Sequence, residues 1–247
     1  QVSDRAGSSL NGTTLLLKLG ADLNMIMEDG DTLLHISRSA DEVKFLLQAG
    51  IIHLDHPNNE GTSPLMSAVK WSDQRYRAIL KIGCNVNHQN QRGHSALHLA
   101  VDRWVPIRYC HENKLQALDE ISNKILMVKT LLNHNSDPLI RDNCRCLCSS
   151  KGCSPSSLLA RPELQWSQGK YWLLEWLLIL KEQMDTGITQ QALLDIIRVK
   201  KFNKLGMTHT CCTQRNSRPF DISTDKDDRE VSDGEKDLIQ KLEDFMG

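Results

Sequence analysis

The stretch Gly61–Val69 reads GTSPLMSAV, and it recurs in altered form as GDTLLHIS from Gly30 and as GHSALHLAV from Gly93. Each copy has a glycine, a hydroxyl residue shortly after it, and an apolar run that opens a helix. The three glycines are 31 and 32 residues apart. Such a spacing indicates a repeat protein, in which each unit buries its apolar face only by stacking on its neighbours.

A second pattern closes each unit, with two apolar residues placed before a glycine or an asparagine. The four copies are LLKLGADLN at Leu16–Asn24, LLQAGIIHL at Leu46–Leu54, ILKIGCNVN at Ile79–Asn87 and LLNHNSDPL at Leu131–Leu139. Gly20, Gly50, Gly83 and Asn135 stand where a helix ends in a left-handed residue. The two patterns together predict helix-turn-helix units joined by hairpin loops.

With a period near 33, these motifs resemble the ankyrin repeat over about residues 10–160. The resemblance implies an all-α ankyrin-repeat solenoid. His35 and His98 occupy the family's Thr-Pro-Leu-His position, where the imidazole bonds within and between repeats. We therefore interpret both histidines as structural, not as ligands or bases. We also expect Thr32 or Thr62 to cap a helix and Pro64 to start one.

The chain is predicted to hold three parts. Residues 1–160 form about four and a half repeats, with insertions near 103–120 and 144–151, residues 161–220 form a non-repeat helical cap, and residues 221–247 form an acidic tail with a short helix. The first unit is half a repeat, so we expect a monomeric segment of a longer protein.

Two helices are expected in the cap. Trp172, Trp176, Ile179 and Leu180 would form the buried stripe of the first. The apolar side of the second would carry Leu193, Leu194, Ile196, Ile197 and Phe202. The spacing of both sets is helical.

The segment Asn143–Cys153 reads NCRCLCSSKGC and carries four of the eight cysteines. Gly152 falls on the same pattern as Gly61. The path from a helix end to the next such glycine takes 10 residues from Gly83 to Gly93 but 17 from Asn135 to Gly152. Seven residues are therefore inserted into this hairpin.

These cysteines and a later segment, GMTHTCC, supply donors for a tetrahedral zinc site made of two short chelating loops. The candidate ligands are Cys144, Cys146, Cys148, Cys153, His209, Cys211 and Cys212. Disulfides, a redox switch, a catalytic Cys-His pair and buried cysteines acting as small hydrophobes remain alternatives. Cys84 is expected to pack as a small residue.

The cysteine-rich hairpin, the LGMTHTCC-like segment from Leu205 and the acidic closing helix together resemble a group of fungal ankyrin-repeat proteins. That resemblance covers nearly the whole chain. It implies an architecture and no reaction.

The leading prediction for function is a non-enzymatic scaffold that binds another protein. Net charge of −1 indicates no nucleic-acid partner, and the longest apolar run is too short to enter a membrane. Hairpin tips and two tryptophans are the candidate contact residues. They are Glu28, Asp29, Asn58, Asn59, Glu60, Trp71, Asn90, Gln91, Arg92 and Trp104. An intracellular location, in cytoplasm or nucleus, is expected. The alternative is a regulatory arm of an enzyme whose catalytic domain precedes Gln1.

Overall fold

The computed structural model describes Leu15 and residues 19–70, 74–102, 114–144, 146, 148–149, 151–160, 169–206 and 240. The chain divides into two compact units, Gln1–Ile140 and Arg141–Gly247. All regular elements within the described residues are helices. The boundary between the two units lies between Ile140 and Arg141, within the range 1–160 predicted for the repeat array.

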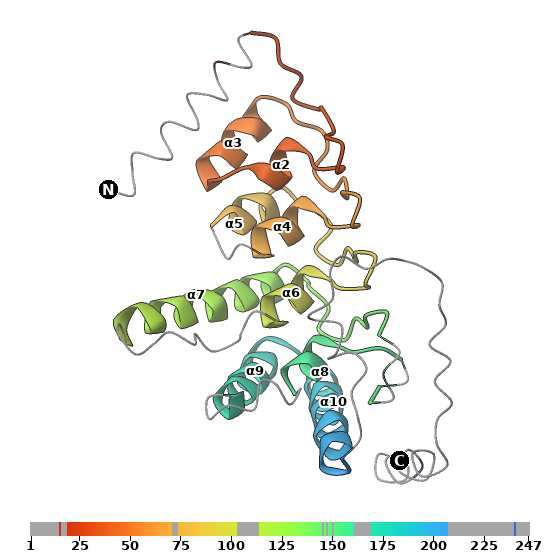
Figure 1. Cartoon of the computed structure of the whole chain (residues 1–247). Coiled ribbons are helices and arrows are strands. Elements are labelled where there is room, and N and C mark those ends of the chain that lie inside the picture. The colour runs from red at the N-terminus through yellow and green to blue at the C-terminus, as the bar shows by residue number, and fades with distance from the viewer. Residues whose placement is uncertain are drawn as a thin grey trace. The chain divides into compact units, whose positions relative to one another are not determined.

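The described part of the first unit consists of three helix pairs. Their bounds are α2 Leu33–Ile36, α3 Ala40–Gln48, α4 Pro64–Lys70, α5 Arg75–Leu80, α6 Ala96–Asp102 and α7 Lys114–Asn133. Helix α4 packs against both α2 and α6, and α3 packs against α5. The pairs therefore stack in chain order, with the hairpin loops all on one side (Figure 1).

The opening helices start at hydroxyl residues, as predicted, but one cap was misassigned. Thr32 is the residue before α2. For α4, the residue whose side chain accepts a helix N–H is Ser63, whose Oγ lies 3.4 Å from the nitrogen of Met66. Thr62 stands one place too early, because Pro64 is already the first helical residue. The Thr62 backbone N–H instead donates to Asn58 in the hairpin loop.

The helix ends confirm the predicted left-handed residues. Gly20, Gly50 and Gly83 have φ of 87°, 94° and 82°, and Asn135 has φ of 63°. After Asn135, the N–H of Ser136 reaches back to the carbonyl of Leu131 at 3.1 Å, which satisfies a terminal helix carbonyl.

The core of the first unit repeats with the sequence. Leu34, Leu65 and Leu97 hold the same place in the three opening helices, and each is almost fully buried. Val43, Ile79 and Leu131 are fully buried on the closing helices. Each helix pair therefore supplies several large apolar side chains to the layers between pairs.

Helix α7 starts at Lys114, so residues 114–120 of the predicted insertion are helical. The segment LQALDEI contains good helix formers and neither glycine nor proline, which favours extension of the helix. The rest of that insertion lies outside the described residues.

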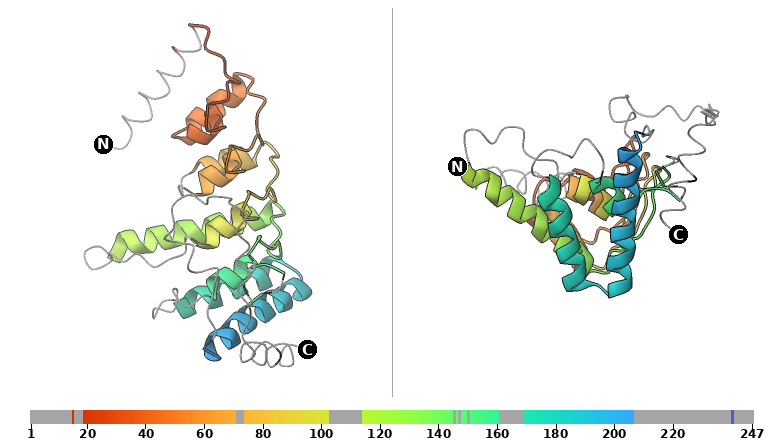
Figure 2. Two further views of the ribbon diagram at one scale, coloured as in Figure 1. Left: turned by 45° about the vertical axis from the view of Figure 1, so that its right-hand side comes forward. Right: turned by 90° about the horizontal axis from the view of Figure 1, so that it is seen from below.

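The second unit contains α8 Pro155–Leu159, α9 Gly169–Gln183 and α10 Thr186–Lys204. Helix α10 packs against both α8 and α9. Residues 184–185 join α9 to α10, and Figure 2 shows these two helices side by side. Trp176 is fully buried, and its indole N–H donates to the Ser156 hydroxyl at 2.9 Å. The predicted core stripe of α9 is confirmed at Trp176, Ile179 and Leu180, while Trp172 is half-buried.

The predicted apolar side of α10 was partly wrong. Leu193 and Leu194 are exposed, whereas Asp195 is buried. The buried positions are Ala192, Asp195, Ile196, Val199 and Phe202. They recur every three or four residues and so form one helix face, which turns the two leucines outward.

Candidate functional sites in the hairpin loops

The hairpin loops of the first unit share one set of bonds at their base. The Asn58 Oδ1 atom accepts the backbone N–H groups of Glu60 and Thr62, each at 3.0 Å. The Asn58 N–H donates to the Thr62 carbonyl at 2.9 Å. Asn90 repeats this pattern with Arg92 and His94, at 3.0 Å for all three bonds. A side-chain amide therefore closes each loop from inside.

Neighbouring loops are also bonded to one another, in what we term the tip ladder (residues 28–29, 59–60 and 91). Asn59 donates its N–H to the Asp29 carbonyl and its Nδ2 to the Glu28 carbonyl, both at 2.8 Å. Gln91 donates to the carbonyls of Glu60 and Asn59, at 3.2 and 2.7 Å. The tip ladder holds the loops in a fixed spacing.

A glycine lets adjacent loops approach each other. Gly61 has φ of 73°, and a Cβ added there would lie 2.8 Å from the backbone nitrogen of Gln91. Only glycine combines this backbone conformation with that contact. The repeated glycine therefore also sets the distance between loops.

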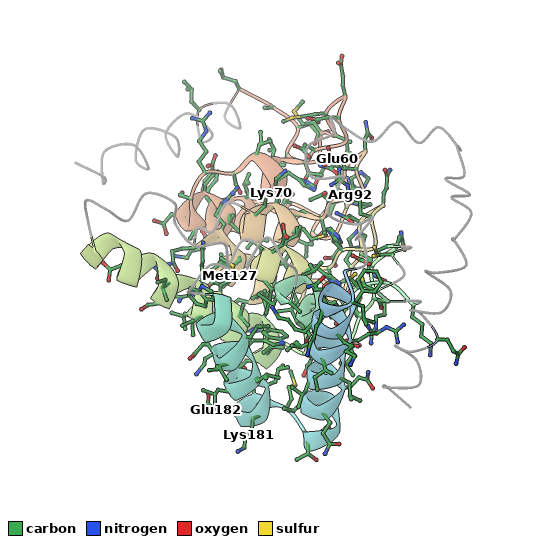
Figure 3. All side chains as sticks on the ribbon, turned by 60° about the horizontal axis from the view of Figure 1, so that its bottom comes forward. Glu60, Lys70, Arg92, Met127, Lys181 and Glu182 are labelled. Atoms are coloured by element: carbon green, nitrogen blue, oxygen red, sulfur yellow. The ribbon has the colours of Figure 1, made fainter. Side chains whose placement is uncertain are left out.

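The predicted contact residues divide into two kinds. The amides of Asn58, Asn59 and Gln91 make bonds inside the array, and Asn90 closes its own loop. The charged side chains of the tips are exposed, and Glu60 and Arg92 extend from the loops (Figure 3). These exposed residues are Glu28, Asp29, Glu60 and Arg92. Trp71 and Trp104 lie outside the described residues.

His35 has the structural role that we predicted. Its Nδ1 accepts the Thr32 N–H at 3.0 Å, so Nε2 carries the proton and donates to the Thr62 carbonyl of the next repeat at 2.9 Å. Burial lowers the pKa of His35 below 6.5 and keeps the ring neutral. His98 is fully buried, and its Nδ1 accepts the Ser95 N–H at 3.1 Å.

The cysteine hairpin (residues 141–153) keeps the same base bonds as the other loops. The Asp142 Oδ1 atom accepts the N–H groups of Cys144 and Cys153, at 3.0 and 2.7 Å. The Asp142 N–H donates to the Cys153 carbonyl at 3.0 Å. Thr62 lies four positions after Asn58, and Cys153 lies eleven positions after Asp142. The difference of seven equals the number of inserted residues that the sequence spacing predicts.

Three possible metal ligands meet at this base. The ligand atoms of Asp142, Cys144 and Cys153 all lie within 4.8 Å of one another. Asp142 and Cys153 are buried, and Cys144 is half-buried. Thiolate and carboxylate are both zinc donors, so the donor set fits this ion. Sequence reasoning missed Asp142, whose only signal was its place two residues before Cys144.

The other predicted ligands are placed differently. Cys146 and Cys148 are buried, and their sulfur atoms lie outside the three-residue group. His209, Cys211 and Cys212 lie outside the described residues. Burial raises the pKa of Cys84 to about 12, so this thiol stays protonated and is a poor ligand.

Helix α10 holds the cysteine hairpin through polar contacts that were not predicted. Asp195 is buried and accepts Arg141 Nη2 at 2.8 Å and the Ser154 hydroxyl at 2.5 Å. Arg198 Nε donates to the Cys148 carbonyl at 2.8 Å. An aspartate inside the apolar run LLDII was the available signal, because a charge on a helix's buried face needs a partner.

No helix among the described residues is long and apolar enough to cross a membrane.

A family model for ankyrin repeats, with three copies, matches residues 5–89. Together with the stacked helix pairs, this match defines the fold as an all-α ankyrin-repeat solenoid. Helices α6 and α7, beyond the matched residues, continue the stack.

The chain is also similar to the nuclear factor NF-kappa-B p105 subunit of Gallus gallus. The two are 32% identical over 103 residues, which are 38% of this chain. The match spans only 10% of the length of that relative. Ankyrin repeats indicate a protein-protein interaction scaffold, and they are generally non-catalytic.

Proposed function

We propose that this chain is a non-enzymatic scaffold that binds a protein partner across the hairpin tips of its ankyrin repeats. The observation that carries this proposal is the tip ladder, which fixes the loops while the charged side chains of Glu28, Asp29, Glu60 and Arg92 remain exposed. A surface that is already ordered binds with little further loss of conformational entropy. Trp71 and Trp104 remain proposed anchors.

The test is charge reversal at the tips. Glu28→Lys, Glu60→Lys and Arg92→Glu in one chain should abolish the specific partners recovered by cross-linking in cells, because a partner matched to these charges would be repelled. The control reverses an exposed pair on α3, with Asp41→Lys and Lys44→Asp, which lie 2.9 Å apart. Equal partner recovery by both variants, with both folded, would contradict the proposal.

Zinc is the second part of the proposal. A zinc ion held by donors among Cys144, Cys146, Cys148, Cys153, His209, Cys211 and Cys212 would join the cysteine hairpin to the segment after α10. Three observations support it. Asp142, Cys144 and Cys153 are grouped at the hairpin base, and Arg198 ties α10 to Cys148. His209 follows the helix end at Lys204 by five residues.

Metal analysis tests this part directly. Full chain purified without added zinc should hold about one zinc ion and should melt at lower temperature in a strong chelator, because metal that binds only the folded state stabilises it. Metal-free protein with an unchanged melt would exclude the zinc site and leave the scaffold proposal untouched.

The third part of the proposal concerns the cellular compartment of the protein and the group of proteins that it resembles. We propose an intracellular protein, in cytoplasm or nucleus, where thiols stay reduced and available to metal. We also propose that the chain is related to the fungal ankyrin-repeat proteins that its cysteine hairpin and C-terminal segment resemble. Localisation of the tagged full-length protein tests the compartment.

A further inference from the structure

The first step is a comparison of three equivalent hairpin positions. Asn58, Asn90 and Asp142 each accept two backbone N–H groups through Oδ1, and each donates its own N–H across the loop. The hydrogen-bonding role is therefore the same. Only the third position carries a carboxylate in place of an amide.

The exchange of amide for carboxylate changes what this position offers to a ligand. In the second repeat the Nδ2 of Asn58 donates to Asp31 at 2.8 Å. The equivalent atom of Asp142 is an oxygen, which accepts and carries negative charge. Asp142 is only 6% exposed. A buried carboxylate oxygen at this place is a zinc donor, whereas the amide nitrogen that it replaces is not.

The second step concerns the neighbours of this position. The residues that donate N–H groups to the closing side chain are Glu60 and Thr62 in one loop, and Arg92 and His94 in the next. In the third loop they are Cys144 and Cys153. Three changes at three equivalent positions thus introduce an anionic oxygen and two sulfur atoms within 4.8 Å of one another.

The third step concerns the position of one sulfur. The Cys146 N–H donates to the Cys144 Sγ at 3.3 Å. This bond from the insertion holds the Cys144 sulfur at the hairpin base, beside Asp142 and Cys153.

We propose that Asp142, Cys144 and Cys153 are three ligands of one zinc ion, and that Cys146 and Cys148 are not. This inference rests on the proposed zinc site and narrows it. Tetrahedral zinc, with Zn–S of about 2.3 Å and Zn–O of about 2.0 Å, holds its ligand atoms about 3.5 to 3.8 Å apart. The ligand atoms, now within 4.8 Å of one another, need to close by at most about 1.3 Å, and one position remains for a fourth donor.

The decisive variant is Asp142→Asn in the full chain. It installs the residue found in the two other hairpins and so preserves the base bonds. We expect its zinc Kd, measured by competition with a chromophoric chelator, to rise at least tenfold. Asn58→Asp is the control, because it creates the same carboxylate without neighbouring cysteines and should add no bound zinc. An unchanged Kd for Asp142→Asn would exclude the carboxylate as a ligand.

Cobalt substitution then counts the sulfur ligands. Thiolate-to-cobalt absorption rises with each bound thiolate, so Cys144→Ser and Cys153→Ser should each reduce it, while Cys146→Ala and Cys148→Ala should leave it unchanged. Loss in the Cys146 or Cys148 variants, with Asp142→Asn unaffected, would overturn this ligand set while a zinc site survives. Absence of bound metal in the unaltered chain would overturn both proposals.

Discussion

The hairpin loops at Asn58 and Asn90 and the cysteine hairpin at Asp142 are built on the same base and stabilised by different partners. The first two loops are held by each other, because Gln91 bonds to Asn59 and Glu60 of the preceding loop. The cysteine hairpin is held by α10 through Asp195 and Arg198. The difference shows that an insertion can keep the repeat's base and still need new contacts for its added residues.

The largest expected effect is at the glycine of the cysteine hairpin. Gly152 has φ of 90°, and a Cβ there would overlap the Asp142 carbonyl oxygen. Gly152→Ala should lower the free energy of unfolding by about 3 kcal/mol or more. Gly50→Ala is the control, because Gly50 has φ of 94° with nothing within 4 Å, and it should cost about 1 kcal/mol. Urea unfolding measures both, and equal costs would mean that the overlap is relieved.

The next largest effect distinguishes the bonds from α10 that hold the cysteine hairpin from the bonds between loops that hold the other two. Asp195→Ala should cost about 3 kcal/mol, because Arg141 and Ser154 lose a buried acceptor. It should also speed amide exchange in the cysteine hairpin and leave the loops at Asn58 and Asn90 protected. Asp185→Ala removes an exposed cap of the same helix and should cost about 1 kcal/mol without exposing the hairpin. Uniform exchange in all three loops would refute the separation.

A smaller effect concerns pH and belongs to the first unit. Because the folded pKa of His35 lies below 6.5, the unfolded chain binds the proton more readily. Stability contributed by His35 is therefore complete above pH 6.5 and is lost as pH falls toward the folded pKa. His35→Gln should flatten the dependence of unfolding free energy on pH below 6.5. Unfolding curves at several pH values measure this, and parallel curves for the two proteins would count against it.

The smallest expected effect tests whether the hairpin loops at Asn58, Asn90 and Asp142 are closed at their bases in equivalent ways. In chelator, Asp142→Asn should change the free energy of unfolding by no more than about 0.5 kcal/mol, because Asn makes the same Oδ1 bonds in two other loops. Asn58→Asp should cost about 1 kcal/mol, since it places a second carboxylate against Asp31. Thermal melts in chelator compare the two, and a large loss in Asp142→Asn would show that the bases are not equivalent.

Much of the array could be predicted because the same motifs recur in successive repeats. The apolar pair before Gly50, Gly83 and Asn135, together with their spacing, predicts these residues as helix ends, and a motif predicts the role of His35. The cap of α4 was misassigned because Thr62 and Ser63 are adjacent hydroxyl residues, and only the helix start at Pro64 distinguishes them.

The candidate site was less predictable, because its geometry depends on which residues the insertion returns to the base. Four nearby cysteines looked equivalent in the sequence. The fold groups Cys144 and Cys153 with Asp142 and leaves Cys146 and Cys148 buried elsewhere. The turn that separates them is stabilised by local bonds, such as the one from the Ser149 N–H to the Cys146 carbonyl at 2.9 Å.

The repeat length, the helix ends and the seven-residue insertion can be predicted from the sequence, because they depend on local backbone preferences and on a period that can be counted. The folded structure is needed to show that Asp195 faces inward, that Leu193 and Leu194 face outward, and that Asp142 lies beside two cysteines. Those results depend on which helix face packs and on residues eleven positions apart, and no local preference specifies either.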